Sequence, residues 1–353
     1  MDISLLKPSL PLFYAISKMH KIPIQFRYIS SSENSSLKPL TVCLHHISKF
    51  FKKFFISYIH KSNSPNKYNS ISSSEQLLNI IYNNNFCSSE HSLHSFTTAD
   101  FSNLFINFSH SIIYDSLIFF SHLIFSYSHR HFLIYNKFSQ SIYFSCSLYK
   151  KLHEDIILPE SQLNYLFFKA IRENYITFAG LIFQQIKGIP MGGNCSLHIA
   201  DLISSVLEYK NNLIPTDIAM FCYIGDLIIG DLLSKETLKS FYFNCPDIQI
   251  TNDNPCSVDY LNLALSSFNN NIITSLYNKR NKYNFFIVNL ANYKTNISLK
   301  IQMATLLTEI FKFINIHSEF KNFIPNLKKF CFLYIQAGFP VNLIIKKVSW
   351  LFF

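Results

Sequence analysis

Helical and strand-like hydrophobic patterns alternate along the first half of the chain. Residues 97–105 hold β-branched and aromatic side chains around a single carboxylate, which predicts a strand, and residues 111–125 then repeat apolar positions at helical spacing. Residues 160–174 again have a helical period, and residues 175–186 alternate like a hairpin with Gly180 at its turn. These segments predict a strand, two helices and a hairpin, in that order.

The N-terminal region has a less regular pattern. Residues 12–30 mix apolar and basic side chains in a way that fits a pair of strands. Residues 62–75 are rich in serine and asparagine and predict a loop, whereas residues 76–82 predict a short helix.

The second half begins with a turn rich in glycine and proline, residues 188–193, which opens a predicted helix over residues 196–210. Residues 220–230 form an apolar run with a polar centre at Gly225-Asp226, as expected of two strands joined by a tight turn. An apolar strand pair is expected after residue 257, and mostly helices from residue 299 onward. We find no internal repeat and no linker that would divide the chain.

The composition is that of a folded, basic protein. Of the 353 residues, 49% are hydrophobic and only 15% are charged, which is far from the composition of disordered chains. The formal net charge of +10 favours a polyanionic partner. It does not name that partner, because plain basic globular proteins are also common.

Cysteine usage and the apolar windows argue against secretion and membrane insertion. The eight cysteines include no C-x-x-C pair, which favours free thiols in a reducing compartment over a zinc or redox site. The N-terminal residues lack the basic start and apolar core of a signal peptide. The most apolar window, residues 111–128, is interrupted by Asp115 and His122. We expect a soluble intracellular protein of the nucleus or cytoplasm with no membrane partner.

Two carboxylates, Asp100 and Asp226, are the candidates for chemistry. Taken singly, Asp100 is explained as a helix N-cap or a solvated strand end, and Asp226 as an ordinary turn residue. The phosphate-loop, nucleophile-elbow and zinc-protease motifs of other common enzyme classes do not occur. The order of segments is more informative, because a Gly-Ile-Pro-Met-Gly run, residues 188–192, lies between the two carboxylates.

In this order the segments resemble the motif blocks of reverse transcriptases, and more narrowly those of retroelements of the LINE- or Penelope-like, non-LTR type. The strand with Asp100 resembles the first block, residues 188–192 the second, and residues 221–227 the Tyr-x-Asp-Asp hairpin. The resemblance extends from about residue 12 to the C-terminus through further matches: Lys18-Met19-His20-Lys21-Ile22-Pro23, Arg27-Tyr28-Ile29, Phe183-Gln184-Gln185, Asn194-Cys195, Ala200-Asp201-Leu202, Leu276-Tyr277-Asn278-Lys279-Arg280, Tyr283-Asn284-Phe285, Ile287-Val288-Asn289 and Gln336-Ala337-Gly338-Phe339-Pro340.

The resemblance implies an α+β fold, the right-hand polymerase with fingers, palm and a short helical thumb. The expected subdomains are a first part of the fingers (residues 1–95), a first part of the palm (96–139), a fingers/palm connection (140–187), the rest of the palm (188–290) and a helical thumb-like region (291–353).

The resemblance also implies two-metal nucleotidyl transfer. Carboxylates must hold two Mg²⁺ (or Mn²⁺) ions, and Asp100 and Asp226 are the expected ligands, with the carbonyl of Phe101 as an additional one. The hairpin departs from the family pattern, because Gly225 stands where the first aspartate of the pair is expected. A glycine offers no side-chain oxygen, so we expect weak ion binding and a loss of orders of magnitude in rate.

Several residues are expected to bind the nucleotide. By resemblance, Lys21 and Arg27 clamp the triphosphate, although both could be solvated strand charges. Phe105 occupies the position that excludes a ribose 2′-hydroxyl, against the alternative of a core aromatic. The loop with Gly188, Pro190, Met191 and Gly192 would approach the templating base, or else simply start a helix.

A basic, aromatic segment after the palm is expected to hold the primer backbone. Lys279, Arg280 and Lys282 alternate there with tyrosine and phenylalanine, although a solvated basic strand would have the same composition.

These expectations define the functional hypotheses. The first is an RNA-directed DNA polymerase (reverse transcriptase) domain of a retroelement that uses an RNA template, a DNA primer and deoxynucleoside triphosphates, with activity impaired by Gly225. The alternative is a catalytically inactive remnant or domesticated protein that still binds nucleic acid. A basic structural protein with no nucleic-acid role would make the ordered motifs a coincidence.

Overall fold

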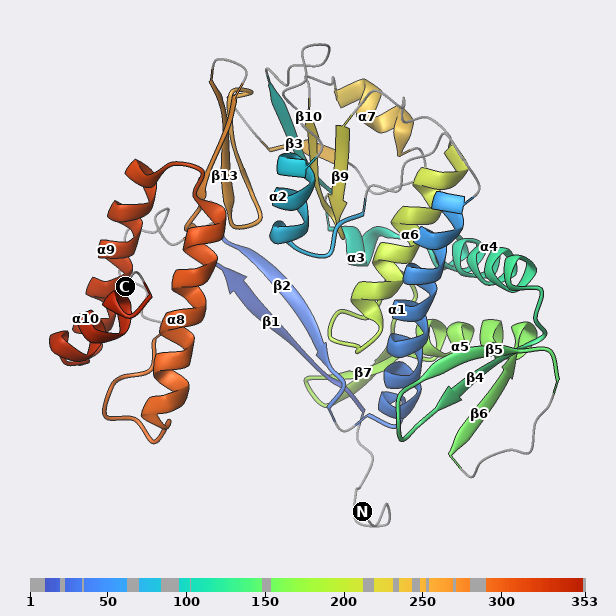
Figure 1. Ribbon diagram of the computed structural model, residues 1–353. Helices are drawn as coiled ribbons and strands as arrows, with labels where there is room; N and C mark the ends of the chain where they lie inside the picture. Colours follow the sequence, from blue (N-terminus) through green and yellow to red (C-terminus); the bar gives the residue numbers. More distant parts are fainter. Residues whose placement is uncertain are drawn as a thin grey trace. The chain divides into compact units, whose positions relative to one another are not determined.

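The computed structural model describes most of the chain, and its elements are labelled in Figure 1. The described residues are 10–19, 23–33, 35–61, 70–83, 95–101, 103–147, 154–211, 219–230, 235–242, 248–251, 254–268, 271–279 and 290–351. The expected loop at residues 62–75 therefore lies largely outside them. The chain forms two compact units. Met1–Ser70, Ala99–Leu227 and Leu233–Ile250 make the first, and Ile71–Thr98, Ile228–Leu232 and Thr251–Phe353 make the second.

An exposed four-stranded sheet in the first unit has the order β2-β1-β7-β8. Strands β1 (Leu12–Lys18) and β2 (Gln25–Ser31) pair antiparallel, which confirms the expected strand pair. Strands β7 (Tyr175–Phe178) and β8 (Leu181–Gln184) form the expected hairpin. Both residues of its turn, Ala179 and Gly180, have positive φ (50° and 77°), as the right-handed twist of a two-residue hairpin requires.

The core of the first unit is helical and rich in phenylalanine. Helices α1 and α4 each pack on α6, and α4 also packs on α5. Figure 1 shows α1 alongside α6. Phe55 of α1 and Phe120 of α4 are fully buried with ring centroids 4.9 Å apart. The hydrophobic spacing predicted three of these helices but not α1. Their bounds are α1 Lys38–Lys61, α4 His110–Ser128, α5 Glu160–Arg172 and α6 Ser196–Asn211.

A small antiparallel sheet follows α4, with β4 (Phe132–Asn136) at its centre. Its neighbours are β5 (Ile142–Ser145) and β6 (Asp155–Pro159). The hydrophobic pattern did not predict this sheet, because its strands are apolar runs of only four or five residues, too short to show a strand or helix period.

A second four-stranded sheet carries the candidate carboxylates and has the order β11-β3-β10-β9. The boundary between the two units runs through β3 and β10. Helix α7 (Lys235–Phe241) contacts β11. The strands are β3 Phe96–Phe101, β9 Ala219–Tyr223, β10 Asp226–Gly230 and β11 Ile248–Ile250.

Two expectations about this sheet need correction. The strand predicted over residues 97–105 ends at Phe101, because Asn103 adopts a left-handed conformation (φ 54°) and the short helix α3, Leu104–Asn107, starts after it. The tight turn in residues 220–230 lies one residue earlier than expected. Ile224 and Gly225 form it, and Asp226 begins β10.

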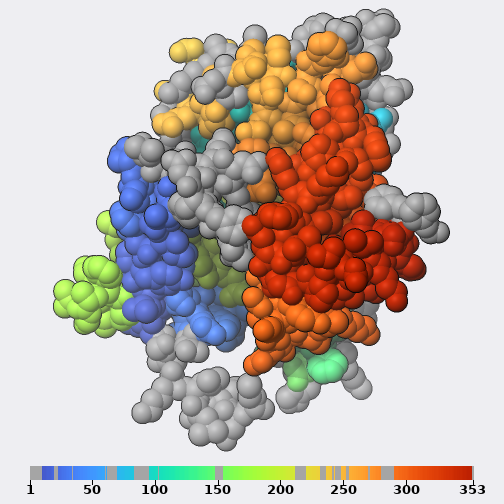
Figure 2. All heavy atoms as spheres, turned by 90° about the vertical axis from the view of Figure 1, so that its left-hand side faces the viewer, coloured from blue at the N-terminus to red at the C-terminus, as the bar shows by residue number. Residues whose placement is uncertain are grey.

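The second unit combines a β-meander with four helices among its described residues. The strand pair expected after residue 257 is a three-stranded sheet of order β12-β13-β14. The helices expected from residue 299 are confirmed, and α8, α9 and α10 gather on the face shown in Figure 2 around a core that includes Leu306, Phe313 and Tyr334. The bounds are α2 Ser74–Asn83, β12 Ser257–Tyr260, β13 Leu263–Phe268, β14 Asn271–Leu276, α8 Leu299–Ile316, α9 Phe320–Gln336 and α10 Val341–Ser349.

Two chain-wide expectations concern cysteines and membranes. Every cysteine that the structure describes is a free thiol. None of the helices within the described ranges combines the length and apolarity needed to cross a bilayer.

Candidate active site

Asp100 and Asp226 lie at the ends of two hydrogen-bonded neighbouring strands. Asp100 is the single exposed residue of β3, and Asp226 is exposed at the start of β10, whose following residues are buried. The backbone N–H of Phe101 donates to the carbonyl of Gly225 at 3.3 Å. This bond joins the neighbours of the two aspartates, so the topology brings both carboxylate-bearing strand ends together.

Gly225 is positioned so that a side chain would point toward Asp100. A Cβ atom added to Gly225 would lie 3.9 Å from Asp100 Oδ1 and 3.1 Å from Leu104 Cδ2. Gly225 is not among the glycines with positive φ, so its backbone accepts an L-amino acid. The strained turn residue is Ile224, a β-branched residue with φ of 61°. A carboxylate at position 225 would therefore reach the vicinity of Asp100 if Leu104 moved by a few tenths of an ångström.

A half-buried carboxyl group, Glu208 of α6, is linked to β3 through Tyr242. Tyr242 packs its ring edge against Phe101 at 4.9 Å and donates its hydroxyl to Glu208 Oε1 at 2.9 Å. Burial raises the pKa of Glu208 from 4.5 to about 7, while the Tyr242 hydrogen bond opposes this rise. The Cys222 thiol of β9 donates to the carbonyl of Ile224 in the turn at 3.6 Å. Glu208 is thus linked through Tyr242 to Phe101, the residue that follows Asp100.

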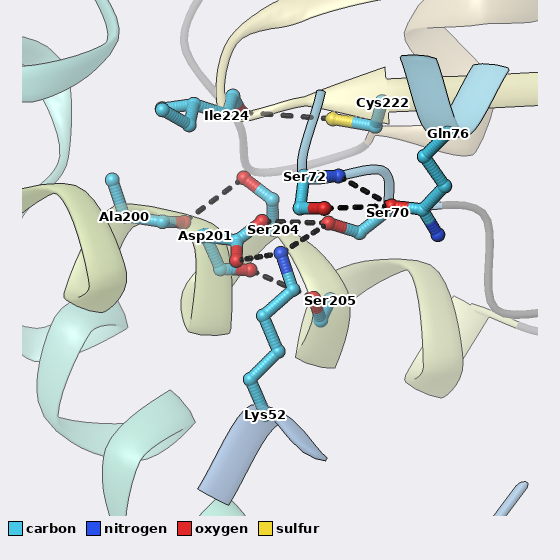
Figure 3. Close-up of polar contacts among 10 residues, drawn as sticks. All are labelled: Lys52, Ser70, Ser72, Gln76, Ala200, Asp201, Ser204, Ser205, Cys222 and Ile224. Carbon is cyan, nitrogen blue, oxygen red and sulfur yellow. Dashed lines mark hydrogen bonds and ion pairs between the residues drawn. The ribbon is translucent and has the colours of Figure 1, made fainter. Parts of the chain in front are cut away.

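Lys52, Asp201 and Ser70 form a closed triangle of polar contacts next to β9 (Figure 3). The Lys52 ammonium of α1 lies 2.5 Å from Asp201 Oδ2 of α6 and donates to Ser70 Oγ at 2.8 Å, and Ser70 Oγ donates to Asp201 Oδ1 at 2.8 Å. The backbone of Ser70 forms an isolated parallel bridge with Cys222. Asp201 belongs to the Ala200-Asp201-Leu202 match, which predicted no role for it. The available signal was a charged residue on an otherwise apolar helix face.

The Gly188 loop is fixed against the chain just after β3. Gly188 has φ of 82° and donates its N–H to the carbonyl of Phe108 at 2.8 Å, and Ile189 donates to that of Phe105 at 2.6 Å. A Cβ on Gly188 would lie 2.5 Å from the carbonyl oxygen of Phe105, a distance that real Cβ atoms do not adopt. Only glycine fits at position 188, because the loop there lies against the backbone of Phe105.

The other end of the same loop is fixed to β2. Gly192 has φ of 116°, and a Cβ on it would collide with the carbonyl oxygen of Ser30. The Ser30 N–H donates to the carbonyl of Met191 at 2.7 Å, and Ser32 Oγ donates to that of Gly192 at 3.0 Å. Arg27 is exposed on the same strand, β2. The loop therefore connects the strand of Arg27 with the segment that follows Asp100.

Comparison with solved structures gives the fold. The apo telomerase of Candida tropicalis is similar with a TM-score of 0.53 and 12% identity, over 96% of this chain and 58% of that one. The RNA-dependent RNA polymerase of a human picobirnavirus is similar with a TM-score of 0.50 and 10% identity, over 93% and 57%. This chain has the right-hand polymerase fold. The expected fold class is thereby confirmed.

The likeness extends to the fold alone. The chain spans just under three fifths of the length of each of these polymerases. No protein-family model and no curated protein matches the sequence.

The remaining predicted site residues of this polymerase fold divide by location. Phe105 is half-buried in α3, next to Leu104, and Pro190 is half-buried in the loop. Lys279 is exposed in the second unit, directly after β14. Lys21, Arg280 and Lys282 lie outside the described residues. The division of the chain into fingers, palm and thumb stays a prediction.

The candidate ligand atoms are of the type that binds magnesium. Asp100 and Asp226 are exposed carboxylates, and such hard oxygen ligands are the ones that Mg²⁺ prefers. Among the residues that the structure describes, no group of three or more His, Cys, Asp or Glu side chains could hold an ion. Gly225 occupies the position from which a third carboxylate would reach Asp100.

Proposed function

We propose that this chain is the reverse transcriptase domain of a retroelement, an RNA-directed DNA polymerase whose catalysis is impaired by Gly225. The observation that carries this proposal is the direction of the missing side chain. A Cβ at Gly225 would lie 3.9 Å from the Asp100 carboxylate, across two adjacent strands of a polymerase fold. The resemblance of the ordered motifs and the similarity to an RNA-dependent RNA polymerase support an RNA template.

Asp100 and Asp226 would hold the divalent cation in this proposal, with the carbonyl of Phe101 as a further oxygen donor. When bound, Mg²⁺ or Mn²⁺ supplies activation of the primer hydroxyl and neutralisation of the leaving pyrophosphate. Because Gly225 supplies no carboxylate, the anionic charge available to the cations is reduced, and we expect their affinity to fall accordingly.

The nucleotide would lie against the Gly188 loop, with β2 on one side and Phe105 on the other. Arg27, exposed on β2, would hold phosphate oxygens through its planar guanidinium, and Phe105 would pack against the sugar and disfavour a 2′-hydroxyl. The attachment of the loop at both ends supports this role, since it keeps β2 and the segment that follows β3 at a fixed spacing.

A nucleic-acid-binding protein without catalysis is the second candidate function. Gly225 favours it directly, because the lost ligand lowers catalysis while leaving the basic surface unchanged. The net charge of +10 is retained in such a protein.

Primer extension on an RNA template with Mg²⁺ tests both candidates. The native chain would be compared with Gly225→Asp, which restores the carboxylate, and with Gly225→Ala, which adds the Cβ near Leu104 but no charge. We expect Gly225→Asp to raise the rate by about 10²-fold or more, the scale of single charge-stabilising groups, and Gly225→Ala to leave it low. Asp100→Ala in the Gly225→Asp background should abolish the gain, whereas Asp115→Asn, at an exposed position of α4, should not.

Two results would contradict the assignment. Strong native extension that survives Asp100→Ala would place the chemistry elsewhere. Equal gains from Gly225→Asp and Gly225→Ala would show that the turn conformation, and not a metal ligand, limits the rate. Retained binding of an RNA–DNA duplex with no extension by any variant would favour the second candidate function.

A further inference from the structure

An apolar groove runs between α9 and α10 in the second unit. Its volume is about 520 Å³, and ten of its eleven lining residues are apolar. The lining side chains recur three or four residues apart from Phe320 to Ile335 on α9, and from Val341 to Val348 on α10. This spacing places one continuous apolar stripe of each helix in the groove.

The groove has a buried floor and exposed walls. Phe323, Leu327 and Ile344 form part of the core beneath it. On the walls, Phe320 is 73% exposed and Ile345 is 59% exposed. Large apolar side chains that converge on one concave surface mark an interaction site, in contrast to apolar residues scattered singly over a surface.

The two helices that form the groove are uniformly basic. Residues 320–353 contain five lysines and no aspartate or glutamate. Lys321 and Lys328 each follow a lining residue by one position, so helical geometry places them beside the apolar stripe. The Lys321 ammonium lies 3.1 Å from Glu319, a carboxylate that precedes α9. Glu319 offsets the charge of Lys321 in part, so the groove combines an apolar floor with an edge whose positive charge comes mainly from Lys328.

Charge and shape together select the occupant. A second copy of this chain docked through the same face would bring two basic edges against each other. A nucleic acid would satisfy the lysines but leave the apolar floor in water. We propose that the α9–α10 groove binds an acidic amphipathic helix of another polypeptide, independently of any polymerase activity.

The geometry of the groove defines that helix. The lining residues of α9 cover 16 positions, from Phe320 to Ile335, or about 22 Å of helix, so the ligand needs roughly four turns. Its apolar residues would recur three or four positions apart along one face and enter the groove, and its Glu or Asp side chains would flank that face and meet Lys321 and Lys328.

The test uses the full chain and a labelled synthetic peptide of about 18 residues with leucine along one helical face and glutamate on the other. A matched peptide carries lysine in place of glutamate. Fluorescence anisotropy should show tighter binding of the glutamate peptide. Ile345→Asp should weaken that binding about tenfold or more, whereas Ile301→Asp on α8, where the isoleucine is 61% exposed, should not change it.

Charge reversal provides a second test, which leaves the apolar surface of the groove unchanged. Lys328→Glu should weaken binding of the glutamate peptide and strengthen binding of the lysine peptide. Lys300→Glu on α8 should change neither affinity. Equal affinity for the two peptides, or equal effects of Ile345→Asp and Ile301→Asp, would overturn the proposal. The proposal would also be overturned if Ile345→Asp converted a dimer to monomers in sedimentation, because the groove would then bind a second copy of the chain. Loss of binding to phosphatidylserine vesicles in this variant would overturn it too, because the groove would then bind a membrane.

Discussion

Glu208 is the residue whose ionisation should most visibly alter stability. Its pKa is raised from 4.5 to about 7 in the folded chain, mainly by burial, so folding favours the protonated form. The free energy of unfolding should therefore fall as pH rises from about 4.5 to 7, by roughly 3 kcal/mol. Glu208→Gln should match the native chain near pH 4 and be more stable at pH 8. Urea unfolding at a series of pH values measures this difference.

His198 also titrates in this pH range, so the effect of Glu208 must be isolated by comparing the native chain with Glu208→Gln. Burial and the nearby His45 lower the pKa of His198 to about 4, so its contribution increases stability as pH rises from 4 to 6.5 and opposes that of Glu208. Above pH 6.5 the histidine is neutral in both states. Tyr242→Phe should raise the pKa of Glu208 further, because the hydroxyl hydrogen bond lowers it. Parallel stability profiles for the native chain and Glu208→Gln would contradict this account.

Single residues also mark the limit of prediction from sequence. Asp100, Gly225 and Asp226 could be selected because their order and local motifs are visible along the chain. The Lys52–Asp201 pair could not, because its partners are 149 positions apart and no local pattern connects them. Glu208 was missed for the same reason. Its environment depends on Tyr242 and Cys222, which belong to other elements.

Among the elements, the Gly188 loop should be the least tolerant of substitution. Gly188→Ala combines a left-handed backbone with a collision against the Phe105 carbonyl, so we expect a loss of about 2–4 kcal/mol of stability. Gly180→Ala is the matched control. Gly180 has a similar φ of 77° with nothing within 4 Å of the added Cβ, so its loss should be about 1–2 kcal/mol. Equal losses in chemical denaturation would mean that the loop does not rest on Phe105 as described.

Elements with a clear period were predictable and those without it were not. The β7–β8 hairpin followed from alternation around Gly180, and α6 from its apolar spacing after a glycine-rich turn. Helix α1 mixes Phe, Lys, His and Ser in a way that obscures its buried face, although Phe51 and Phe55 are fully buried. The sheet around β4 depends on pairing with β6, between residues as far apart in the sequence as Phe132 and Pro159, and a local hydrophobic period does not reveal such pairing.

At the scale of the whole molecule, the excess of positive charge should control nucleic-acid affinity. Binding of a labelled RNA–DNA duplex should weaken at least about tenfold between 50 and 200 mM salt, because bound phosphates release counterions. Lys279→Ala should reduce the slope of log affinity against log salt by about 1. Lys312→Ala is the control, since that ammonium lies 3.9 Å from Glu309 on α8. Identical slopes for the two variants would remove Lys279 from the binding surface.

The position of Gly225 also bears on the history of the gene. Every glycine codon becomes an aspartate or glutamate codon by one change at its second base, so the acidic side chain next to Asp100 is a single substitution away. The turn backbone already accepts a side chain, and the hydrogen bond from Phe101 uses the carbonyl of Gly225, which any residue at this position supplies. Copies of this sequence that differ by that one base would share the same scaffold and differ only in chemistry.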